Sequence, residues 1–573
     1  MDKSDVARVL GQIAAFLELR GEDQFRVRAY KAAARAVTSY PEDLRQALAS
    51  GALTELKGIG PATLDIIDEI LTGGRSHVLD ELREQIPPGL VEMLQISGLG
   101  VAKIRQIHES LGIDSLAELE EAARSGRLAG LPRFGKKTAE NILKGIDFLR
   151  HVSGHRLFHH ARKEARALAD VLSATPGVRR AEVAGSVRRC REIIRDLDFV
   201  VLLDGPPAPF FNRLATAPGV TQSIPAGDRR VTLRFQSGSV AEIHAASEPQ
   251  FGFQLVRATG SEEHVAALAA RARARGLSWE DDGLAHDGTL LPTPTEESVY
   301  DALDLQWIPP ELREATGEIE AAAAGTLPDL IRLEDLQGFL HCHTDYSDGA
   351  SRVSDWAAAA AERGYTYLGI TDHSQALTDA GGLLARDIAR QHAEVDTVNR
   401  DFPHLRVLKG VEADILEDGS LDYTPQVRAD FEFIIASVHS HLTLSTDQMT
   451  ARVLTAMDDP TMTILGHPTG RLLLSRDPFP LDLERVFETA AERGIAVEIN
   501  ADPQRLDLDW RVLRQASAAG VTISLGADAH NTAGMANVEI GIGIARKGWL
   551  TAATVLNTRS ADEFLAFARR RGQ

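Results

Sequence analysis

The spacing of apolar residues changes along the chain, and each spacing predicts a different kind of element. Up to about residue 150 the spacing is helical, as in VARVLGQIAAFLEL (6–19) and RVRAYKAAARAV (26–37), with short Gly and Pro turns between the helices. Between residues 181 and 246 it is close to two, in AEVAGS, DLDFVVLL, VTLRFQ and VAEIHAA, which predicts strands. A helical N-terminal region is therefore followed by a mixed region of helices and short strands, which runs to about residue 315.

The pattern changes again from residue 336 onward. Short apolar runs alternate there with helical stretches, and the runs are LGIT, RVLKGVEAD, FIIASVHS, TILGHP, IAVEINA and TISLGAD. Alternating short strands and helices are typical of parallel βα units. We therefore expect the last part of the chain to close into a βα barrel, whose chemistry would lie at the C-terminal ends of the strands.

Length and composition limit the class of protein. A chain of 573 residues is too long for one core, so three or four domains are expected. No apolar run reaches the roughly 20 residues of a membrane span, and the start has no signal-peptide pattern. The two cysteines, Cys190 and Cys342, fit a reducing cytoplasm. The net charge of −20 excludes a histone-like polycation but not local contacts with nucleic-acid phosphates.

A repeated motif lies in the helical region. LKGIGPATLDII (56–67) and ISGLGVAKIRQI (96–107) are alike, and LPRFGKKTAENI (131–142) is a weaker copy in which Arg133 replaces the first glycine. Each copy places a tight glycine turn between two helices, as in a helix-hairpin-helix, and points helix N-terminal N–H groups outward. A plain helical hairpin is the alternative for one copy, whereas three copies favour binding of DNA backbone phosphates. The residues expected to do so are Gly58, Gly60, Gly98, Gly100, Gly135 and Lys136.

Metal-ligating residue types follow the predicted barrel strands. A lone histidine is more often structural, but nine such groups at or just past strand ends favour a multinuclear metal site. They exceed what one ion needs, and mixed imidazole and carboxylate ligands suit two or three Zn, Mn or Fe ions. Arg471 is either a phosphate-binding residue or a barrel-surface residue. The nine candidate ligands are His341, His343, Asp348, His373, Glu412, His439, His467, Asp528 and His530.

A second candidate site lies in AGSVRRCREIIRDLDFVV (184–201). Asp196 and Asp198 would point the same way from one strand, which suits a site for two Mg²⁺ ions. Gly185 and Ser186 would hold a nucleotide triphosphate, and Arg189 would neutralise its charge. The alternative is a solvent-facing acidic strand after a basic turn.

The nine C-terminal residues match the ligand pattern of the PHP (polymerase and histidinol phosphatase) family, which residues 336 to 573 closely resemble. This resemblance implies a distorted (β/α)7 barrel with three metals. It also implies 3′→5′ exonuclease activity and, as a further option, endonuclease activity at abasic sites.

The whole chain resembles bacterial X-family DNA polymerases fused to a PHP domain. FRVRAYKAAARAV, GIGPA, GSVRR, DLDFVV, FGFQLVRATGSEEH and WIPPELRE match that family in order. The resemblance implies a monomeric enzyme of base excision repair that fills gaps with dNTPs and trims DNA 3′ ends, with Mg²⁺ or Mn²⁺ in the palm. The implied parts are an N-terminal DNA-end-binding domain (1–85), fingers (86–150), a nucleotidyltransferase palm (151–248), a thumb (249–315), a linker (316–335) and the PHP domain (336–573).

Several positions depart from the polymerase pattern. The third palm carboxylate falls on Glu242, where the family has Asp, and the Arg two residues later is His244. Arg195 replaces a glycine, and an aromatic pair is replaced at residues 257–258, an Arg-Ala pair. The lysine expected as a Schiff-base nucleophile falls on Ile66, which argues against lyase activity by that route, with Lys31 a distant substitute. We expect weak or Mn²⁺-dependent synthesis, because Mn²⁺ tolerates imperfect geometry better than Mg²⁺.

Three other functions remain open at this point. The chain could be a nuclease whose polymerase half only holds DNA. It could also be a small-molecule phosphatase of the histidinol-phosphate type, although the hairpin repeats argue against that. A non-catalytic DNA-end scaffold is the last, and the complete set of nine candidate ligands argues against it.

Overall fold

The computed structural model describes residues 3–40, 44–96, 98–132 and 134–569. These form two compact units, of which one spans residues 1–153 and the other residues 154–573 apart from the short segment 474–476. Among the described residues no helix has the length and apolarity needed to cross a bilayer.

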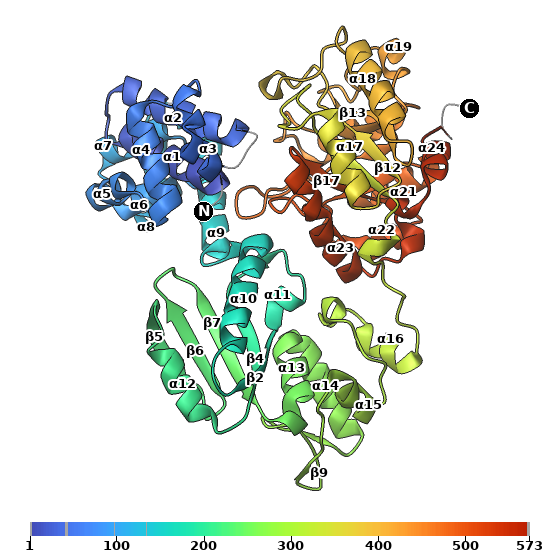
Figure 1. Ribbon diagram of the computed structural model, residues 1–573. Coiled ribbons are helices and arrows are strands. Elements are labelled where there is room, and N and C mark those ends of the chain that lie inside the picture. Colours follow the sequence, from blue (N-terminus) through green and yellow to red (C-terminus); the bar gives the residue numbers. More distant parts are fainter. Residues whose placement is uncertain (1–2, 41–43, 97, 133, 570–573) are drawn as a thin grey trace. The chain divides into compact units, whose positions relative to one another are not determined.

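The first unit is helical, as the spacing of its apolar residues predicts (Figure 1). Helix α1 lies at its centre and buries Leu10, Ile13 and Leu17 completely or nearly so. The elements are α1 (Lys3–Leu19), α2 (Gln24–Ser39), α3 (Leu44–Ser50), η1 (Ala52–Glu55), α4 (Pro61–Gly73), α5 (His77–Gln85), α6 (Pro88–Met93), α7 (Val101–Leu111), α8 (Leu116–Arg124), η2 (Arg127–Gly130) and α9 (Lys136–Val152).

The second unit begins with a mixed sheet, in the order β2-β4-β7-β6-β5, in which only the neighbours β4 and β7 run parallel. Alternate residues of β4 face opposite sides. Phe199 and Val201 pack with α10 and α12, whereas Val200 and Leu202 pack with α13. The elements are β1 (Arg156–Leu157), α10 (Phe158–Ser173), β2 (Val178–Val183), α11 (Gly185–Arg188), β3 (Ile193–Ile194), β4 (Leu197–Leu203), α12 (Pro207–Ala215), β5 (Val220–Pro225), β6 (Arg230–Phe235) and β7 (Val240–Ala246).

Two details of this sheet differ from the sequence-based expectation. Strand β5 was not predicted, because its residues Thr221, Gln222 and Ser223 hide the alternation of an edge strand. The strand expected to carry both aspartates begins only at Leu197, so Asp196 lies one residue before it.

A small, mostly helical region follows the sheet, and Tyr300 and Phe253 are the largest side chains of its core. The elements are η3 (Glu248–Gln250), α13 (Phe251–Thr259), α14 (Glu262–Ala274), β8 (Ser278–Trp279), β9 (Leu284–His286), β10 (Thr289–Leu290), α15 (Glu296–Ala302), η4 (Pro310–Leu312), α16 (Glu318–Ala324) and η5 (Leu333–Asp335).

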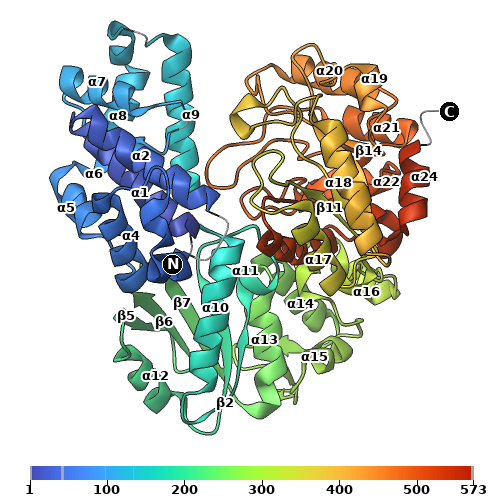
Figure 2. The same cartoon turned by 45° about the horizontal axis from the view of Figure 1, so that its top comes forward.

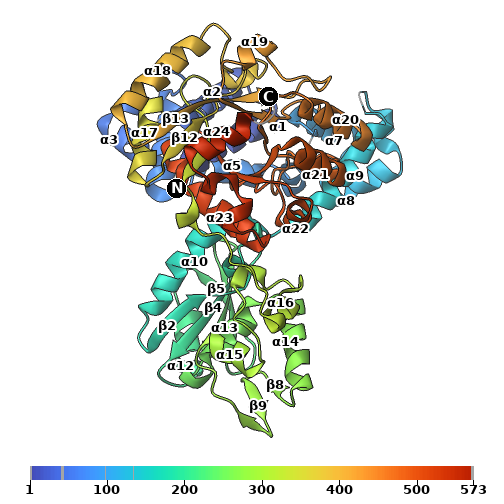
Figure 3. The same ribbon diagram turned by 90° about the vertical axis from the view of Figure 1, so that its right-hand side faces the viewer.

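The barrel expected from the alternation of strands and helices is confirmed. Strands β11 to β17 are all parallel and form a closed barrel in which they follow one another in sequence order. Helices surround them (Figure 2). In Figure 3 the barrel, yellow to red, lies above the green sheet and the helices α13 to α15 of the same unit. The strands are β11 (Gly338–Cys342), β12 (Tyr367–Ile370), β13 (Arg406–Asp414), β14 (Phe433–Ser437), β15 (Ile464–Leu465), β16 (Ala496–Asn500) and β17 (Ile523–Ala529).

The last helix of the chain closes one end of the barrel. Its Phe564 is completely buried and stacks near Tyr367 and Phe433, which lie at the starts of β12 and β14. The opposite end, where the strands finish, stays free for polar groups. The helices of this region are α17 (Val353–Glu362), η6 (Thr378–Ala380), α18 (Ile388–Asp401), α19 (Pro425–Arg428), α20 (Thr446–Met457), α21 (Leu483–Arg493), α22 (Trp510–Ala518), η7 (Thr532–Asn537), α23 (Val538–Lys547), η8 (Ala552–Thr554), η9 (Leu556–Thr558) and α24 (Ala561–Arg569).

The buried ring of Phe564 yields a test of this packing. Phe564→Ala should lower the free energy of unfolding of the barrel by about 3–5 kcal/mol, because it leaves a cavity among Tyr367 and Phe433. Urea unfolding followed by tryptophan fluorescence measures this. Val171→Ala is the control, since Val171 is 61% exposed and its loss should change stability by less than about 0.5 kcal/mol. Equal effects of the two substitutions on stability would contradict the conclusion that α24 closes this end of the barrel.

Candidate metal centre and palm site

The nine candidate ligands lie together at the mouth of the barrel. His341, Glu412 and Asp528 lie within strands β11, β13 and β17. The other histidines lie just past strand ends, and they are His343, His373, His439, His467 and His530. Asp348 comes from the loop between β11 and α17. Side chains from almost two hundred residues of sequence therefore converge because parallel strands finish at one end of the barrel.

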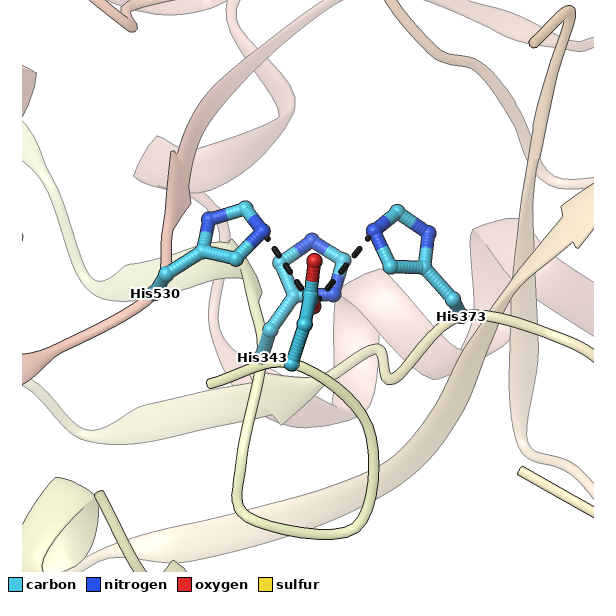
Figure 4. Close-up of side chains that lie close together, drawn as sticks. His343, His373 and His530 are labelled. Carbon is cyan, nitrogen blue, oxygen red and sulfur yellow. Dashed lines mark ion pairs between the residues drawn. The ribbon is translucent and has the colours of Figure 1, made fainter. Parts of the chain in front are cut away.

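The ligand atoms form three overlapping groups in which every atom lies within 4.8 Å of the others. The first group includes Asp348, whose Oδ1 lies 3.3 Å from His530 Nε2 and 3.6 Å from His373 Nε2. Figure 4 shows His343, His373 and His530 arranged around this carboxylate. His343 and His373 each belong to two groups, so the three groups adjoin one another. The groups are His343, Asp348, His373 and His530; His341, His343 and Asp528; and His373, Glu412 and His439.

Glu412 is the central carboxylate of this cluster. Its oxygens lie 2.7 Å from His373 Nδ1, 3.0 Å from His467 Nε2, 3.3 Å from His341 Nε2 and 3.4 Å from His439 Nε2. Through the contact with His467, the ninth ligand joins the three groups. Burial alone would raise the pKa of Glu412, but His341, His439 and His373 together hold it well below its usual value. The carboxylate is therefore charged in a fully buried position.

Only some of the ligand atoms that face one another form hydrogen bonds, such as His467 Nε2 with Glu412 Oε1 at 3.0 Å and His343 Nε2 with Asp528 Oδ1 at 3.2 Å. His341 Nε2, His373 Nδ1 and Glu412 Oε2 are buried and meet no hydrogen-bond geometry with any described residue. Unpaired buried polar atoms are costly, so their accumulation at one place requires a compensating group. Imidazole and carboxylate atoms that face a common centre fit divalent cations, which pair with all of them at once.

Outer carboxylates orient two of these rings. Glu498 Oε1 lies 2.6 Å from His341 Nδ1, and Asp414 Oδ1 lies 2.9 Å from His439 Nδ1, so the Nε2 atom of each ring faces the cluster. Metal-binding histidines commonly use their second nitrogen in this way. Sequence analysis missed both acids. Their signal was a carboxylate inside an otherwise apolar strand, in IAVEINA and RVLKGVEAD.

Backbone strain is concentrated at the same mouth. His341, His467 and Asp528 have φ values of +61°, +23° and +48°, which is the left-handed region that residues other than glycine rarely occupy. Such conformations cost on the order of 1–3 kcal/mol each and collect at functional sites. They aim the three side chains inward from the ends of the strands.

Arg471 neither faces the cluster nor lies on the surface. It is 7% exposed, and its guanidinium donates to Asp509 Oδ2 at 2.5 Å, to the Arg505 carbonyl at 2.9 Å and to the Leu506 carbonyl. Arg505, and not Arg471, lies beside the cluster, where sequence analysis considered a phosphate-binding arginine. Its Nε lies 3.3 Å from Asp528 Oδ2, and it lines a hollow of about 300 Å³ together with the cluster.

In the mixed sheet, Asp198 and Glu242 lie opposite each other in the register of β4 and β7. Burial, Asp196 and Glu242 raise the pKa of Asp198 to about 7. The structure thus brings the three predicted palm carboxylates together. Glu242 is also held by Arg230 Nη1 and His244 Nε2, each at 3.1 Å, and the hydrogen bond from His244 lowers its pKa.

Gly185 brings a turn directly against this carboxylate pair. Its φ is +60°, and a Cβ at this position would lie 1.7 Å from Asp198 Oδ2, so only glycine fits. The neighbouring Ser186 Oγ is buried and bonds to no described residue. The guanidinium of Arg189 is engaged elsewhere, because it donates to Glu314 Oε1 at 2.9 Å and to the Thr259 carbonyl at 2.6 Å. Arg189 still lowers the pKa of Asp198 by its charge, so the two lie close.

The predicted hairpin residues share one local geometry. Gly60, Gly100 and Gly135 are the N-caps of α4, α7 and α9, and the glycines two residues before the first two have positive φ. All six predicted residues of the motif are exposed, so the N-terminal turns of three helices are accessible to an anion, although α4 begins with Pro61, which has no N–H. Arg133 of the third copy lies outside the described residues.

Comparison with known protein families divides the chain in the same way. Residues 1–76 match the helix-hairpin-helix domain and residues 90–147 match the SAM-like helix-hairpin-helix tandem. Residues 254–314 match the DNA polymerase beta thumb, and residues 340–502 match the PHP domain.

Curated proteins resemble the chain over its full length or over the barrel alone. A DNA polymerase/3′-5′ exonuclease PolX from Bacillus subtilis (strain 168) is 35% identical over 574 residues, which is 100% of both chains. A probable phosphatase from Thermoanaerobacter sp. (strain X514) is 27% identical over 38% of this chain and 89% of its own. Another from Vibrio atlanticus (strain LGP32) is 27% identical over 41% of this chain and 93% of its own. On the full-length match and the four matched domains, the chain belongs to the family of bacterial X-family DNA polymerases that carry a C-terminal PHP domain.

Proposed function

We propose that this protein is a DNA repair enzyme that fills short gaps at the palm site and removes 3′ nucleotides at the barrel mouth. The observation that carries the proposal is the convergence of nine ligand side chains around unpaired, buried imidazole and carboxylate atoms. The exposed helix N-termini of three hairpins support a DNA substrate, since they can hold backbone phosphates without reading sequence.

At the barrel mouth, the three ligand groups would hold two or three Zn²⁺, Mn²⁺ or Fe ions. Such ions supply a hydroxide near neutral pH and charge stabilisation for a phosphodiester. Glu412 and Asp528 would supply the negative charge that holds these cations, because each lies among several imidazoles. Arg505 would bind the scissile phosphate from the hollow beside the cluster, and Glu498 would hold the ring of His341 in position.

At the palm, Asp196, Asp198 and Glu242 would hold Mg²⁺ or Mn²⁺, and Gly185 and Ser186 would bind the triphosphate of a dNTP. The unpaired Ser186 hydroxyl supports this, because it is buried beside the carboxylates and free to donate. Arg189 contributes its charge from behind the turn rather than by direct contact. Glu242 is restrained by Arg230 and His244, which favours weak synthesis and a preference for Mn²⁺.

Other parts of the chain are assigned in the same proposal. The N-terminal domain (1–85) and fingers (86–150) would bind gapped DNA or 3′ ends. The parts that follow them in the sequence would be the palm (151–248), the thumb (249–315), the linker (316–335) and the PHP domain (336–573). The protein would act as a cytoplasmic monomer. Lyase activity is not expected, because Ile66 is buried and Lys31 is paired with Glu18 at 2.7 Å.

A second candidate function is a nuclease whose polymerase half only holds DNA. The contacts of Arg230 and His244 with Glu242 favour it, since both side chains compete with a metal ion for that carboxylate. A small-molecule phosphatase would account for the similarity of the barrel to probable phosphatases but not for the exposed hairpins.

Two substitutions separate these functions on the same purified protein. His341→Ala should reduce exonuclease activity by at least about 10²-fold and leave primer extension intact, because only the barrel mouth loses a ligand. Asp198→Asn should do the reverse. Primer extension on gapped DNA and release of 3′ nucleotides are measured with Mg²⁺ and with Mn²⁺. Absence of synthesis by the wild type with both metals would favour the nuclease, and equal loss of both activities in either variant would contradict two separate sites.

The raised pKa of Asp198 predicts a pH dependence of metal binding at the palm. A proton held up to about pH 7 competes with the cation, so affinity falls as the pH drops through 7. The Mn²⁺ concentration for half-maximal primer extension should rise about tenfold between pH 8 and pH 6. Asp204→Asn, an exposed carboxylate at the end of the same strand, should leave this profile unchanged. A concentration that stays constant from pH 8 to pH 6 would contradict the prediction.

The two arginines near the barrel mouth should behave differently. Arg505→Ala should lower kcat/KM of the exonuclease by about 10- to 100-fold, because a charge-assisted contact to phosphate is lost. Its metal content, measured by plasma mass spectrometry, should match the wild type. Arg471→Ala should instead lower the melting temperature, because it removes a buried ion pair with Asp509. Full exonuclease activity of Arg505→Ala would refute the assigned phosphate contact.

A further inference from the structure

The turn that carries the proposed nucleotide-binding residues touches the barrel domain as well as its own sheet. This turn segment comprises residues 185–192 and lies beside helices α22 and α23. Lys547, the last residue of α23, points its Nζ at the segment and lies 3.0 Å from the Arg189 carbonyl oxygen. A side chain of the proposed nuclease domain therefore holds the backbone of the proposed polymerase site.

Glu314 makes a second link between the same partners. Its carboxylate accepts from Lys547 Nζ at 2.5 Å, from Arg189 Nε at 2.9 Å and from Arg191 Nη1 at 3.2 Å. Burial opposes its ionisation, but Lys547 and Arg189 lower the pKa of Glu314 to about 2. One charged carboxylate thus joins the barrel helix to two side chains of the turn segment.

The ammonium group of Lys547 lies among groups of the turn segment, of residues 311–314 and of α22. Besides Glu314 and the Arg189 carbonyl, its Nζ lies 3.4 Å from the Glu311 carbonyl and 4.5 Å from the ring centre of Trp510. Its side chain is fully buried, so the ammonium has no access to water. Separating a buried charge from its partners costs much free energy. The contacts of Lys547 therefore hold the turn segment in its position.

Two further contacts of the turn segment reach the barrel helices. Glu192 accepts from Trp510 Nε1 at 3.1 Å and from Arg511 Nη1 at 2.6 Å. Cys190 packs on Gly543 of α23, where an added Cβ would lie 3.0 Å from its Sγ. The helix can approach this closely because it has a glycine at the point of contact.

The other side of the turn segment is held by the helical region after the sheet. Arg189 donates to the Thr259 carbonyl, and Arg188 binds Glu296 with both terminal nitrogens at 2.6 and 2.9 Å. The turn is therefore fixed between two neighbours, of which the barrel is one. Gly185, at its start, packs directly against Asp198.

We infer that Lys547 is a positioning residue for nucleotide binding at the palm, acting from the PHP domain through Glu314 and the Arg189 carbonyl. This rests on the proposed polymerase function. The barrel domain would then support the polymerase site as well as carry the nuclease site. Loss of Lys547 should loosen the Gly185–Ser186 turn and weaken dNTP binding, while the ligands at the barrel mouth stay in place.

Lys547→Met tests the inference, because it keeps the aliphatic stem and removes the charge. The matched control is Lys409→Met, since Lys409 also lies in the barrel and pairs with Asp396 at 2.6 Å, away from the turn segment. Gly543→Ala is a second variant that pushes α23 against Cys190 without removing a charge. In full-length protein, the Kd of dATP with Mn²⁺ is measured by calorimetry, and KM and kcat by primer extension.

The Kd and KM for dATP should rise about tenfold in Lys547→Met, as expected for one lost charged hydrogen bond, with kcat changed less. Gly543→Ala should shift them in the same direction, and Lys409→Met should not. Exonuclease rates should stay within about twofold of the wild type in all three. An unchanged Kd and KM in Lys547→Met would overturn the inference, even if its melting temperature falls. A wild type that neither binds dATP nor extends a primer would instead overturn the proposed polymerase function.

Discussion

The barrel mouth depends on one unfavourable arrangement, a buried carboxylate surrounded by imidazoles. Glu412 lies in ion-pair contact with five histidines although it is fully buried, and its pKa is held well below its usual value. Its Oε2 atom and His341 Nε2 meet no hydrogen-bond geometry with any described residue. An arrangement of this kind is stable only when a compensating charge lies among the ligand atoms, and divalent cations provide it. The strained backbone at three ligands and the outer acids Glu498 and Asp414 serve to hold that arrangement.

The two proposed active sites are built on different principles and lie in domains that a buried ionic cluster joins. The barrel mouth places its candidate ligands on or just past six of the seven barrel strands, whereas the palm places three carboxylates on and beside neighbouring strands. Between them, Glu314 gathers Lys547, Arg189 and Arg191 into one buried ionic cluster. Within this unit, charged side chains therefore join the sheet and the barrel. A structural change in one of these domains can alter the position of residues in the other.

Local patterns were sufficient to predict the barrel and to find nine candidate ligands that meet at its mouth, because short apolar runs that alternate with helical stretches leave a clear signal. Contacts that depend on closure of the barrel were beyond them. Glu498 lies 157 residues from His341 and meets it only because β16 and β11 share one mouth. Arg505, rather than Arg471, lines the hollow for the same reason. The edge strand β5 was hidden by three consecutive polar residues.

The most direct measurement is the number of metal ions that the purified full-length protein retains after loading with Mn²⁺ or Zn²⁺ and gel filtration. Plasma mass spectrometry on wild type and Glu412→Gln gives this number per chain. The account predicts two or three retained ions in the wild type and fewer in the variant, because the central carboxylate contacts several ligand groups. A wild type that retains no ion, or a variant that retains as many as the wild type, would contradict it.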